Sequence, residues 1–245
     1  MSRVAVFGAT SLIAQEYSRI LAARGETLFL VGRNADKLIA LEKDLTIRGA
    51  AKVAYCVADL GDLKEHPRLV AEMEHAIGEC DVALIAHGVL PDQKSAERDF
   101  HLAEQTIATN FTSAASLCEL LATRFEARRA GTIAVISSVA GDRARASAYF
   151  YNATKAALDA YLTGLRHRLD RSGVLVMTIK PGLVDTPMTA HLKKTPLFAS
   201  AGAVARDIDR AIQNGRTVVY VAGFWRWIML AVRLIPEPLF KRMNF

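Results

Sequence analysis

Short apolar segments alternate with longer amphipathic segments along almost the whole of this 245-residue chain. The apolar segments are typical of buried strands, and the segments between them carry apolar residues at helical spacing. Strands that alternate with helices form a parallel sheet with helices on both faces, so we predict one doubly wound α/β domain of about seven strands over residues 1–245. The predicted strands are Val4–Phe7, Thr27–Val31, Lys52–Val57, Val82–Ile85, Gly131–Ile136, Val174–Ile179 and Val218–Ala222.

The composition supports a single folded domain and limits its partners. Hydrophobic residues make up 51% of the chain, and no linker, repeat or low-complexity stretch divides it. Cys56, Cys80 and Cys118 lack metal-ligand or redox spacing, so we expect buried thiols, no metal site and a reducing cytoplasm. The first strand begins almost at Met1, which leaves no room for a secretory signal. The net charge of +6 comes without a basic stripe of interleaved aromatic residues, so we exclude nucleic acid as a partner.

The first predicted strand leads into a turn of small residues and then into a helix. Residues 8–11 read Gly-Ala-Thr-Ser, and residues 12–24 carry apolar side chains at helical spacing before Gly25 ends the helix. Backbone N–H groups at such a helix N-terminus receive the pyrophosphate of a dinucleotide. Because glycine turns also occur in α/β proteins that bind no nucleotide, this segment alone leaves both interpretations open.

Tyr151 and Lys155, with Ser138 upstream of them, are the residues best suited to chemistry. A tyrosine and a lysine four residues apart on a helix lie on one face, so the ammonium can lie beside the phenol. A nearby cation lowers the phenol pKa from about 10, which suits the phenol to proton transfer at neutral pH. The Ser138 hydroxyl would hold a carbonyl oxygen while Tyr151 passes the proton. By itself this spacing recurs by chance on helix surfaces, so the neighbouring motifs decide its weight.

Taken in order, these segments resemble the short-chain dehydrogenase/reductase family from the first strand to about Thr189. The resemblance implies a Rossmann-type fold, a nicotinamide dinucleotide as cofactor, and a catalytic tetrad of Asn110, Ser138, Tyr151 and Lys155. Asn110 lies within a predicted long helix, His101–Glu126, where an unpaired polar side chain would cost stability. A satisfied core amide is the alternative interpretation of Asn110.

The resemblance also implies that the turn, the strand ends and the catalytic helix bind the cofactor. Two positions depart from the family: of its TGxxxGxG turn only the first glycine remains, so Leu12 adds bulk near the pyrophosphate, and His87 stands where the family usually has asparagine. We expect the backbone of His87 to keep its role. The residues implied are Gly8, Thr10, Ser11, Leu12, Ile13, Arg33, Asp59, Leu60, Ala86, His87, Gly88, Tyr151, Lys155, Pro181, Gly182, Val184 and Thr186.

The residue after the second strand distinguishes two cofactors. An acidic residue there would bind the ribose hydroxyls of NAD, whereas Arg33 can pair with the 2′-phosphate of NADP. We therefore expect NADP(H) rather than NAD(H), and a solvated turn arginine is the alternative. Asp59 corresponds to the family residue near the adenine, and its alternative role is a helix cap before Leu63.

Basic residues gather in the two segments where the resemblance places the substrate, after the catalytic serine and in the lid that follows the sixth strand. They are Arg143, Arg145, His191, Lys193 and Lys194. Clustered cations at a pocket mouth attract an anionic group such as a phosphate, although a solvated basic surface has the same pattern. We predict substrate contacts by Ser138, Arg143, Arg145, Tyr151 and His191.

Residues 224–245 form an apolar helix followed by a basic tail. The predicted helix, Phe224–Ile235, contains two tryptophans, and its two arginines share one stripe. It is shorter than the about 20 residues that cross a bilayer, and Pro236 ends it. We expect it to lie in a membrane interface on the inner face of the membrane, to be buried in a homo-oligomer, or to cover the substrate pocket.

Residues 137–145 and 188–197, together with the tail, resemble the decaprenylphosphoryl-2-keto-erythro-pentose reductases. This narrower resemblance implies reduction of the 2-keto group of a polyprenyl-phosphate-linked pentose in cell-wall synthesis. We predict an NADP(H)-dependent oxidoreductase that interconverts a ketone and a secondary alcohol. The alternatives are a reductase of another soluble or lipophilic ketone, and a non-catalytic NADP(H) sensor, which would have no use for Ser138, Tyr151 and Lys155.

Overall fold

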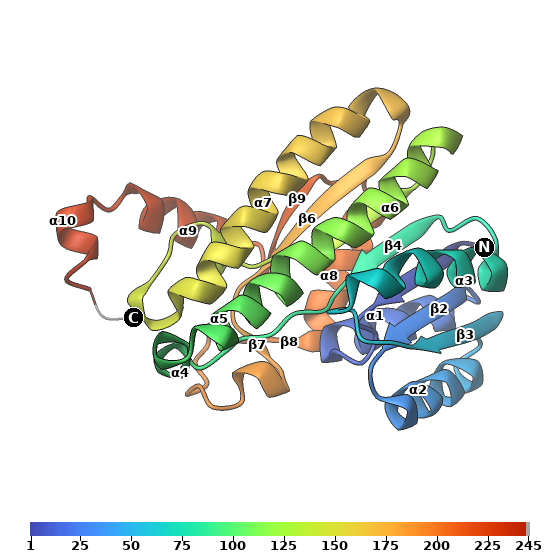
Figure 1. Cartoon of the computed structure of the whole chain (residues 1–245), viewed down its shortest axis with the longest axis horizontal. Coiled ribbons are helices and arrows are strands. Elements are labelled where there is room, and N and C mark those ends of the chain that lie inside the picture. The colour runs from blue at the N-terminus through green and yellow to red at the C-terminus, as the bar shows by residue number, and fades with distance from the viewer. Residues whose placement is uncertain (244–245) are drawn as a thin grey trace.

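Seven parallel strands form the central sheet in the computed structural model, which describes residues 1–243 (Figure 1). Their order across the sheet is β3-β2-β1-β4-β5-β6-β9. The strands are β1 (Arg3–Phe7), β2 (Thr27–Gly32), β3 (Lys52–Val57), β4 (Val82–Ile85), β5 (Thr132–Ile136), β6 (Leu175–Pro181) and β9 (Val218–Val221). The predicted doubly wound sheet is confirmed, with strand ends shifted by one or two residues.

The order of the strands determines where a ligand can bind. In register, Ala5 of β1 lies between Phe29 of β2 and Ala83 of β4, and the chain runs outward in opposite directions from this point. In open α/β sheets, ligands bind at the carboxyl ends of the strands beside such a reversal. The turns after β1 and β4 therefore border the crevice.

Helices cover both faces of the sheet and bury two apolar layers. The helices of one face are α3 (His66–Ile77), α6 (Ser113–Arg128) and α7 (Tyr149–Leu169), and those of the other face are α1 (Leu12–Ala23), α2 (Ala35–Ile47) and α8 (Ala201–Gln213) (Figure 1). Leu69, Leu117 and Leu158 are fully buried in the first layer, and Tyr17 and Val204 in the second. Each such side chain contributes about 1.5–3 kcal/mol through burial of apolar surface.

The helix predicted over His101–Glu126 is interrupted. The chain forms α4 (Gln93–Arg98) and α5 (Phe100–Ile107), then a π-helical turn at Ala108–Thr112, before α6 begins at Ser113. The wider turn places Asn110 where its side chain bonds to the backbone after β4. Single π-helical turns within helices are frequent at functional sites.

Two further features were not expected from the sequence. The strands β7 (Val184–Asp185) and β8 (Ala199–Ser200) pair in parallel and bring together the ends of the predicted lid. Cys56 is half-buried, because its strand lies at the edge of the sheet, whereas the other two thiols are buried as predicted. Short 3₁₀ turns occur at Leu63–Glu65, Val139–Gly141, Ala146–Ala148, Asp170–Ser172 and Pro187–Thr189.

The last described residues, 224–243, form an arm that we call the C-terminal arm. It contains α9 (Trp225–Leu234) and α10 (Glu237–Phe240), which project beyond the end of the sheet (Figure 1). Asn244 and Phe245, the end of the predicted tail, lie outside the described residues. Within residues 1–243, no helix combines the length and apolar character needed to cross a membrane.

Candidate active site

The turn after β1 lies against the end of β4. Gly8 has φ +87°, and a Cβ on Gly8 would lie 2.6 Å from the backbone nitrogen of His87, so only glycine fits. Ser11 then caps α1, because its Oγ accepts a hydrogen bond from the Ala14 N–H at 3.3 Å. The first N–H groups of a helix have no partner within it, so those of Leu12 and Ile13 can receive an anion.

A hollow of about 350 Å³ extends from this turn between α1 and α2. Thr10 and Leu12 line it. The Leu12 side chain therefore lies beside the predicted pyrophosphate site, where we expected it to add bulk. Lys37 and Pro187 line it as well. We did not predict Lys37, which lies in the first turn of α2, four residues after Arg33. A glycine turn, a helix N-terminus and a basic hollow fit a phosphate-bearing dinucleotide.

Arg33 and Asp59 follow neighbouring strands at the same edge, and both are exposed. No acidic side chain among residues 1–243 pairs with Arg33, so its guanidinium is available to an anion. Asp59 Oδ1 accepts the Gly61 N–H at 2.9 Å, whereas Asp62 caps the following turn by accepting the Lys64 N–H at 3.0 Å. The alternative of Asp59 as a helix cap is therefore wrong.

The residues after β4 offer backbone groups, and no charged side chain, to a ligand in the crevice. The His87 ring points to α6, where Nε2 lies 2.9 Å from the Ser113 hydroxyl, and burial lowers the pKa of His87 to about 3. The ring is therefore neutral. Ala86 and Leu60 are buried, and a Cβ on Gly88 would lie 3.2 Å from Asn110 Oδ1.

Ser138, Tyr151 and Lys155 lie together at the carboxyl edge of β5. Ser138 lies two residues after the end of β5 and caps the next turn, where its Oγ accepts the Ala140 N–H at 3.1 Å. Its hydroxyl also lies near enough to Tyr151 to lower the pKa of the phenol. Tyr151 and Lys155 lie one turn apart on α7, and Lys155 Nζ is 5.8 Å from the centre of the Tyr151 ring. The structure thus brings together the three residues that the spacing singled out.

The protonation of this pair differs from the sequence expectation. Burial lowers the pKa of Lys155 to about 8, and Lys155 Nζ donates to the Ile136 carbonyl at 3.0 Å. Burial also raises the pKa of Tyr151, although the nearby Ser138 hydroxyl lowers it in part. Removal of both groups from water therefore outweighs the attraction of the ammonium for a phenolate. At neutral pH the phenol is protonated, which is the form that donates a proton.

Asn110 connects the catalytic helix to the end of β4. Its Oδ1 accepts the Val89 N–H at 2.8 Å, and its Nδ2 donates to the Val89 carbonyl at 2.9 Å and to Thr154 Oγ1 at 3.3 Å. Thr154 directly precedes Lys155. The amide is satisfied in the core and lies close to Lys155, because a Cβ on Gly88 would be 3.2 Å from Asn110 Oδ1 and 3.8 Å from Lys155 Nζ.

A buried charge network that the sequence did not reveal lies behind these residues. Lys180 Nζ, at the end of β6, is 2.5 Å from Asp142 and 2.8 Å from Asp159. The Tyr220 hydroxyl donates to Asp142 at 2.8 Å. Burial raises the pKa of Asp159, which lies on α7 one turn beyond Lys155. The network joins the catalytic helix to the segments around Asp142 and Lys180.

The Pro-Gly segment after β6 lies against the C-terminal arm. Gly182 donates its N–H to the Val221 carbonyl at 2.8 Å, and a Cβ on Gly182 would overlap the indole of Trp225. Trp225 is only 8% exposed. Beyond Pro181 and Gly182, Val184 begins β7 and Thr186 caps the next turn. No local sequence pattern indicates that Trp225 reaches this segment.

Arg143, for which we predicted a substrate contact, contacts the C-terminal arm. Its guanidinium donates to the carbonyls of Val232 and Ile235 at 2.7 and 2.5 Å, pairs with Glu237 at 2.9 Å, and lies 3.7 Å from the centre of the Phe240 ring. Both terminal nitrogens of the guanidinium, Nη1 and Nη2, are therefore bonded to the C-terminal arm. Arg143 is therefore not free to bind a substrate anion in this structure.

The other basic residues of the predicted substrate region differ in their exposure and in their ion pairs. His191 and Lys193 are exposed, and Arg145 is half-buried. Lys194 forms an ion pair with Asp185 at 2.6 Å. An anion at this end of the crevice would thus be met by Arg145, His191 and Lys193 rather than by Arg143.

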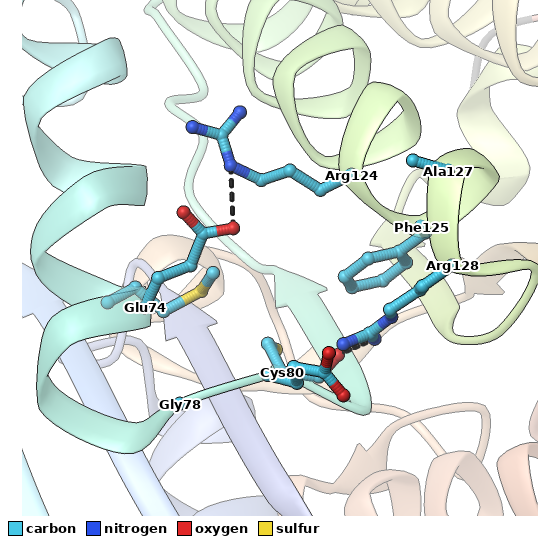
Figure 2. A pocket seen from close by; sticks show the side chains of 9 residues that line it. Glu74, Gly78, Cys80, Arg124, Phe125, Ala127 and Arg128 are labelled. Carbon is cyan, nitrogen blue, oxygen red and sulfur yellow. Dashed lines mark hydrogen bonds and ion pairs between the residues drawn. The ribbon is translucent and has the colours of Figure 1, made fainter.

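A second hollow, of about 590 Å³, belongs to another part of the molecule. Figure 2 shows that residues before β4 and at the end of α6 line it, with an ion pair of 2.7 Å between Glu74 and Arg124. These segments border the amino ends of the strands, opposite the crevice. The hollow is therefore separate from the candidate active site.

Comparison with known proteins agrees with this geometry. Residues 2–197 match the family described as short chain dehydrogenase. The chain belongs to that family. An uncharacterized oxidoreductase of Mycobacterium tuberculosis is 36% identical over 240 residues, which cover 98% of this chain and 96% of the relative. The chain is thus an oxidoreductase of this family, and the name of that relative specifies no substrate.

Solved structures share the fold over nearly the full length. A short-chain dehydrogenase from Sphingobium yanoikuyae in complex with NADPH has a TM-score of 0.83 at 23% identity, and covers 100% of this chain and 97% of its own. An actinorhodin polyketide ketoreductase variant with NADPH has a TM-score of 0.82 at 24% identity, with 91% and 97% covered. At this identity the likeness establishes the fold.

Proposed function

We propose that the chain interconverts a ketone and a secondary alcohol with NADP(H). The observation that carries the proposal is the position of Tyr151 at the carboxyl edge of the sheet, with the buried Lys155 Nζ 5.8 Å from its ring and the Ser138 hydroxyl near enough to lower its pKa. A hydroxyl donor beside a protonated phenol suits a carbonyl oxygen that gains negative charge. A protein that only sensed the dinucleotide would have no use for this set.

In the proposed reduction, Ser138 orients the carbonyl oxygen and Tyr151 donates its phenolic proton to it. Lys155 stabilises the phenolate that this leaves, because its ammonium lies on the same side of α7. Asn110 holds the backbone at Val89 and contacts Thr154, and so keeps α7 in place relative to β4. A bound nicotinamide supplies or accepts the hydride.

The preference for NADP(H) is supported by two basic residues, Arg33 directly after β2 and Lys37 in the first turn of α2. Arg33 is exposed without an acidic partner among residues 1–243, and Lys37 lines the hollow beside the glycine turn. A guanidinium at this place pairs with a 2′-phosphate. The complexes of two structural neighbours with NADPH support the same choice. We assign the reaction to the cytoplasm, which the free cysteines suit.

The substrate proposed from the narrower resemblance is the 2-keto group of a polyprenyl-phosphate-linked pentose. Arg145, His191 and Lys193 remain as groups for its phosphate, whereas Arg143 is engaged by the C-terminal arm. The alternative substrate is another soluble or lipophilic ketone, which would not need these three residues for binding.

The proposal is tested by measuring NADPH oxidation by the purified protein. The substrates are a polyprenyl-phosphate keto-pentose and a panel of neutral ketones. Turnover of any ketone supports the reaction class, and a preference for the phosphate-bearing substrate supports the narrower proposal. Binding of NADPH without turnover of any member of the panel would contradict the reaction.

Replacement of Arg33 by alanine tests the cofactor choice. We expect NADPH binding to weaken about tenfold or more, as the loss of one charge-assisted hydrogen-bonded pair predicts, with NADH binding unchanged. Arg98→Ala, on α4, is the matched control. Fluorescence titration gives both dissociation constants, and an unchanged NADPH to NADH ratio would show that Arg33 does not select the cofactor.

A further inference from the structure

The C-terminal arm has one face against the protein and one face in solvent. Trp225, Met229 and Phe240 are buried, whereas Trp227, Leu230 and Leu234 are 66%, 46% and 74% exposed. The exposed three are spaced by three and four residues, so they form one stripe along α9. Phe224, just before α9, and Leu239 and Met243, after it in the chain, are exposed apolar residues of the same arm.

Exposed apolar side chains are concentrated in this arm. Six of the 18 large apolar side chains that are exposed within residues 1–243 belong to residues 224–243. Single exposed apolar residues are ordinary, but a continuous patch marks a surface that meets a partner or a lipid phase. Trp227 adds the amphipathic ring that is enriched at the border between water and lipid.

The charges beside the stripe indicate what the surface meets. Arg226, Arg233, Lys241 and Arg242 are all exposed and basic. The single acidic residue of the described arm, Glu237, is paired with Arg143 at 2.9 Å, so it does not offset them. A two-fold contact with a second copy would bring this basic surface against itself. An anionic surface complements it.

The dimensions of the arm fit a helix that lies flat on a surface. The 10 residues of α9 span about 15 Å, half the thickness of the apolar part of a bilayer. The Arg143 contacts with the carbonyls of Val232 and Ile235 hold α9 on the body, so the stripe has a fixed direction. Apolar side chains in one plane with flanking arginines are the pattern of an interfacial helix.

We propose that the outer face of the C-terminal arm docks on an anionic lipid surface, with Trp227, Leu230 and Leu234 in the interface and the four basic residues against the headgroups. The proposal does not depend on the reaction proposed above, because it rests on the exposed face of the arm alone. The inner face of α9 lies on Gly182, so docking would bring the catalytic crevice close to the lipid surface.

Co-sedimentation of the full chain with vesicles tests the docking. We expect binding to vesicles of phosphatidylcholine with phosphatidylglycerol, weaker binding to phosphatidylcholine alone, and loss of the difference at high salt. Arg226→Glu with Arg233→Glu should lower the partition coefficient for anionic vesicles by at least fivefold for each arginine, the equivalent of about 1 kcal/mol. Lys43→Glu with Lys64→Glu is the control, because both lysines are exposed and the change in net charge is the same.

The apolar stripe is tested with Trp227→Ser, Leu230→Ser and Leu234→Ser in one chain, which should reduce vesicle binding about tenfold for each side chain. The matched control is Ile47→Ser with Val57→Ser and Leu63→Ser, which removes three exposed apolar side chains from another surface. Circular dichroism verifies that each variant is folded. Equal binding to neutral and anionic vesicles, or equal loss in the control, overturns the proposal. A dimer that the stripe variant dissociates, without vesicle binding by the wild type, overturns it in favour of a second copy.

Discussion

The catalytic crevice and the C-terminal arm each contain a basic side chain that donates to backbone carbonyls, yet the two residues have different functions. Lys155 donates to one carbonyl at the end of β5 and lies beside Tyr151. Arg143 donates to the carbonyls at the end of α9, about 90 residues away in sequence. Both follow Ser138 in the chain, Arg143 by five residues and Lys155 by 17. Their hydrogen bonds, rather than their distance from Ser138 in sequence, show that Arg143 holds the arm whereas Lys155 lies beside the residues proposed for the reaction.

Tyr151→Phe is the variant that separates the two regions most strongly. Removal of the phenolic proton should lower kcat by about 10²–10⁴-fold, the range for general acid catalysis, with NADPH binding and thermal stability retained. Tyr161→Phe is the control, because it removes a hydroxyl from the same helix where it contacts Glu119. Steady-state NADPH oxidation gives the rates. A Tyr151→Phe chain with wild-type turnover would remove Tyr151 from the mechanism.

Arg143→Ala tests whether this residue belongs to the arm. The loss of charge-assisted bonds from a side chain that is 15% exposed should lower the free energy of unfolding by about 3 kcal/mol. Arg145→Ala should change it by less than about 0.5 kcal/mol. Urea unfolding measures both, and limited proteolysis should cleave the arm faster in Arg143→Ala. An unchanged stability with a raised KM for an anionic substrate would restore the interpretation of Arg143 as a substrate residue.

Gly182→Ala tests the contact between the two regions. The added methyl would overlap the Trp225 indole, and overpacking of this kind costs about 2 kcal/mol. In the Trp225→Ala background the same substitution should cost almost nothing, because the overlapping ring is gone. Gly223→Ala is the control, since a Cβ there meets no atom within 4 Å. Urea unfolding of the four chains yields the coupling energy, and additive effects would show that the ring does not press on Gly182.

The pH dependence distinguishes the lysine of the crevice from the tyrosine. With a pKa lowered to about 8, Lys155 is an ammonium below that pH and neutral above it. The kcat/KM for reduction should therefore fall with rising pH, by up to about tenfold per unit above 8. Tyr151 remains protonated there because its pKa is raised. Lys155→Arg keeps its charge, so its profile should lack this decline. An identical decline in Lys155→Arg would assign it to another group.

The crevice could be predicted because its parts follow from local patterns. The apolar segments gave the seven strands, and parallel strands in this order place the residues after β1, β4 and β5 at one edge. The spacing of Tyr151 and Lys155 gave their common helix face. The catalytic roles of these residues remain predictions, but their assembly required no knowledge of contacts between distant segments.

The remaining features depend on contacts that no local pattern encodes. The pKa of Tyr151 rises because tertiary structure buries it, whereas the sequence shows only the nearby lysine. The π-helical turn that contains Asn110 accompanies hydrogen bonds between its amide and Val89, a residue from another part of the fold. Trp225 is buried by a glycine more than 40 residues earlier. In each contact, neither residue belongs to a local sequence pattern that predicts its partner.

The buried network of Asp142, Asp159 and Lys180 has a consequence for how such chains diverge. Removal of Lys180 leaves both carboxylates buried without their cation, at a cost of about 3–5 kcal/mol. Neutral replacement of Lys180 alone would therefore be selected against, while its replacement together with both carboxylates would leave no unpaired charge. We expect these positions to change together among relatives, so that a substitution of Lys180 at the end of β6 is accompanied by substitutions both on α7 and in the segment after Ser138.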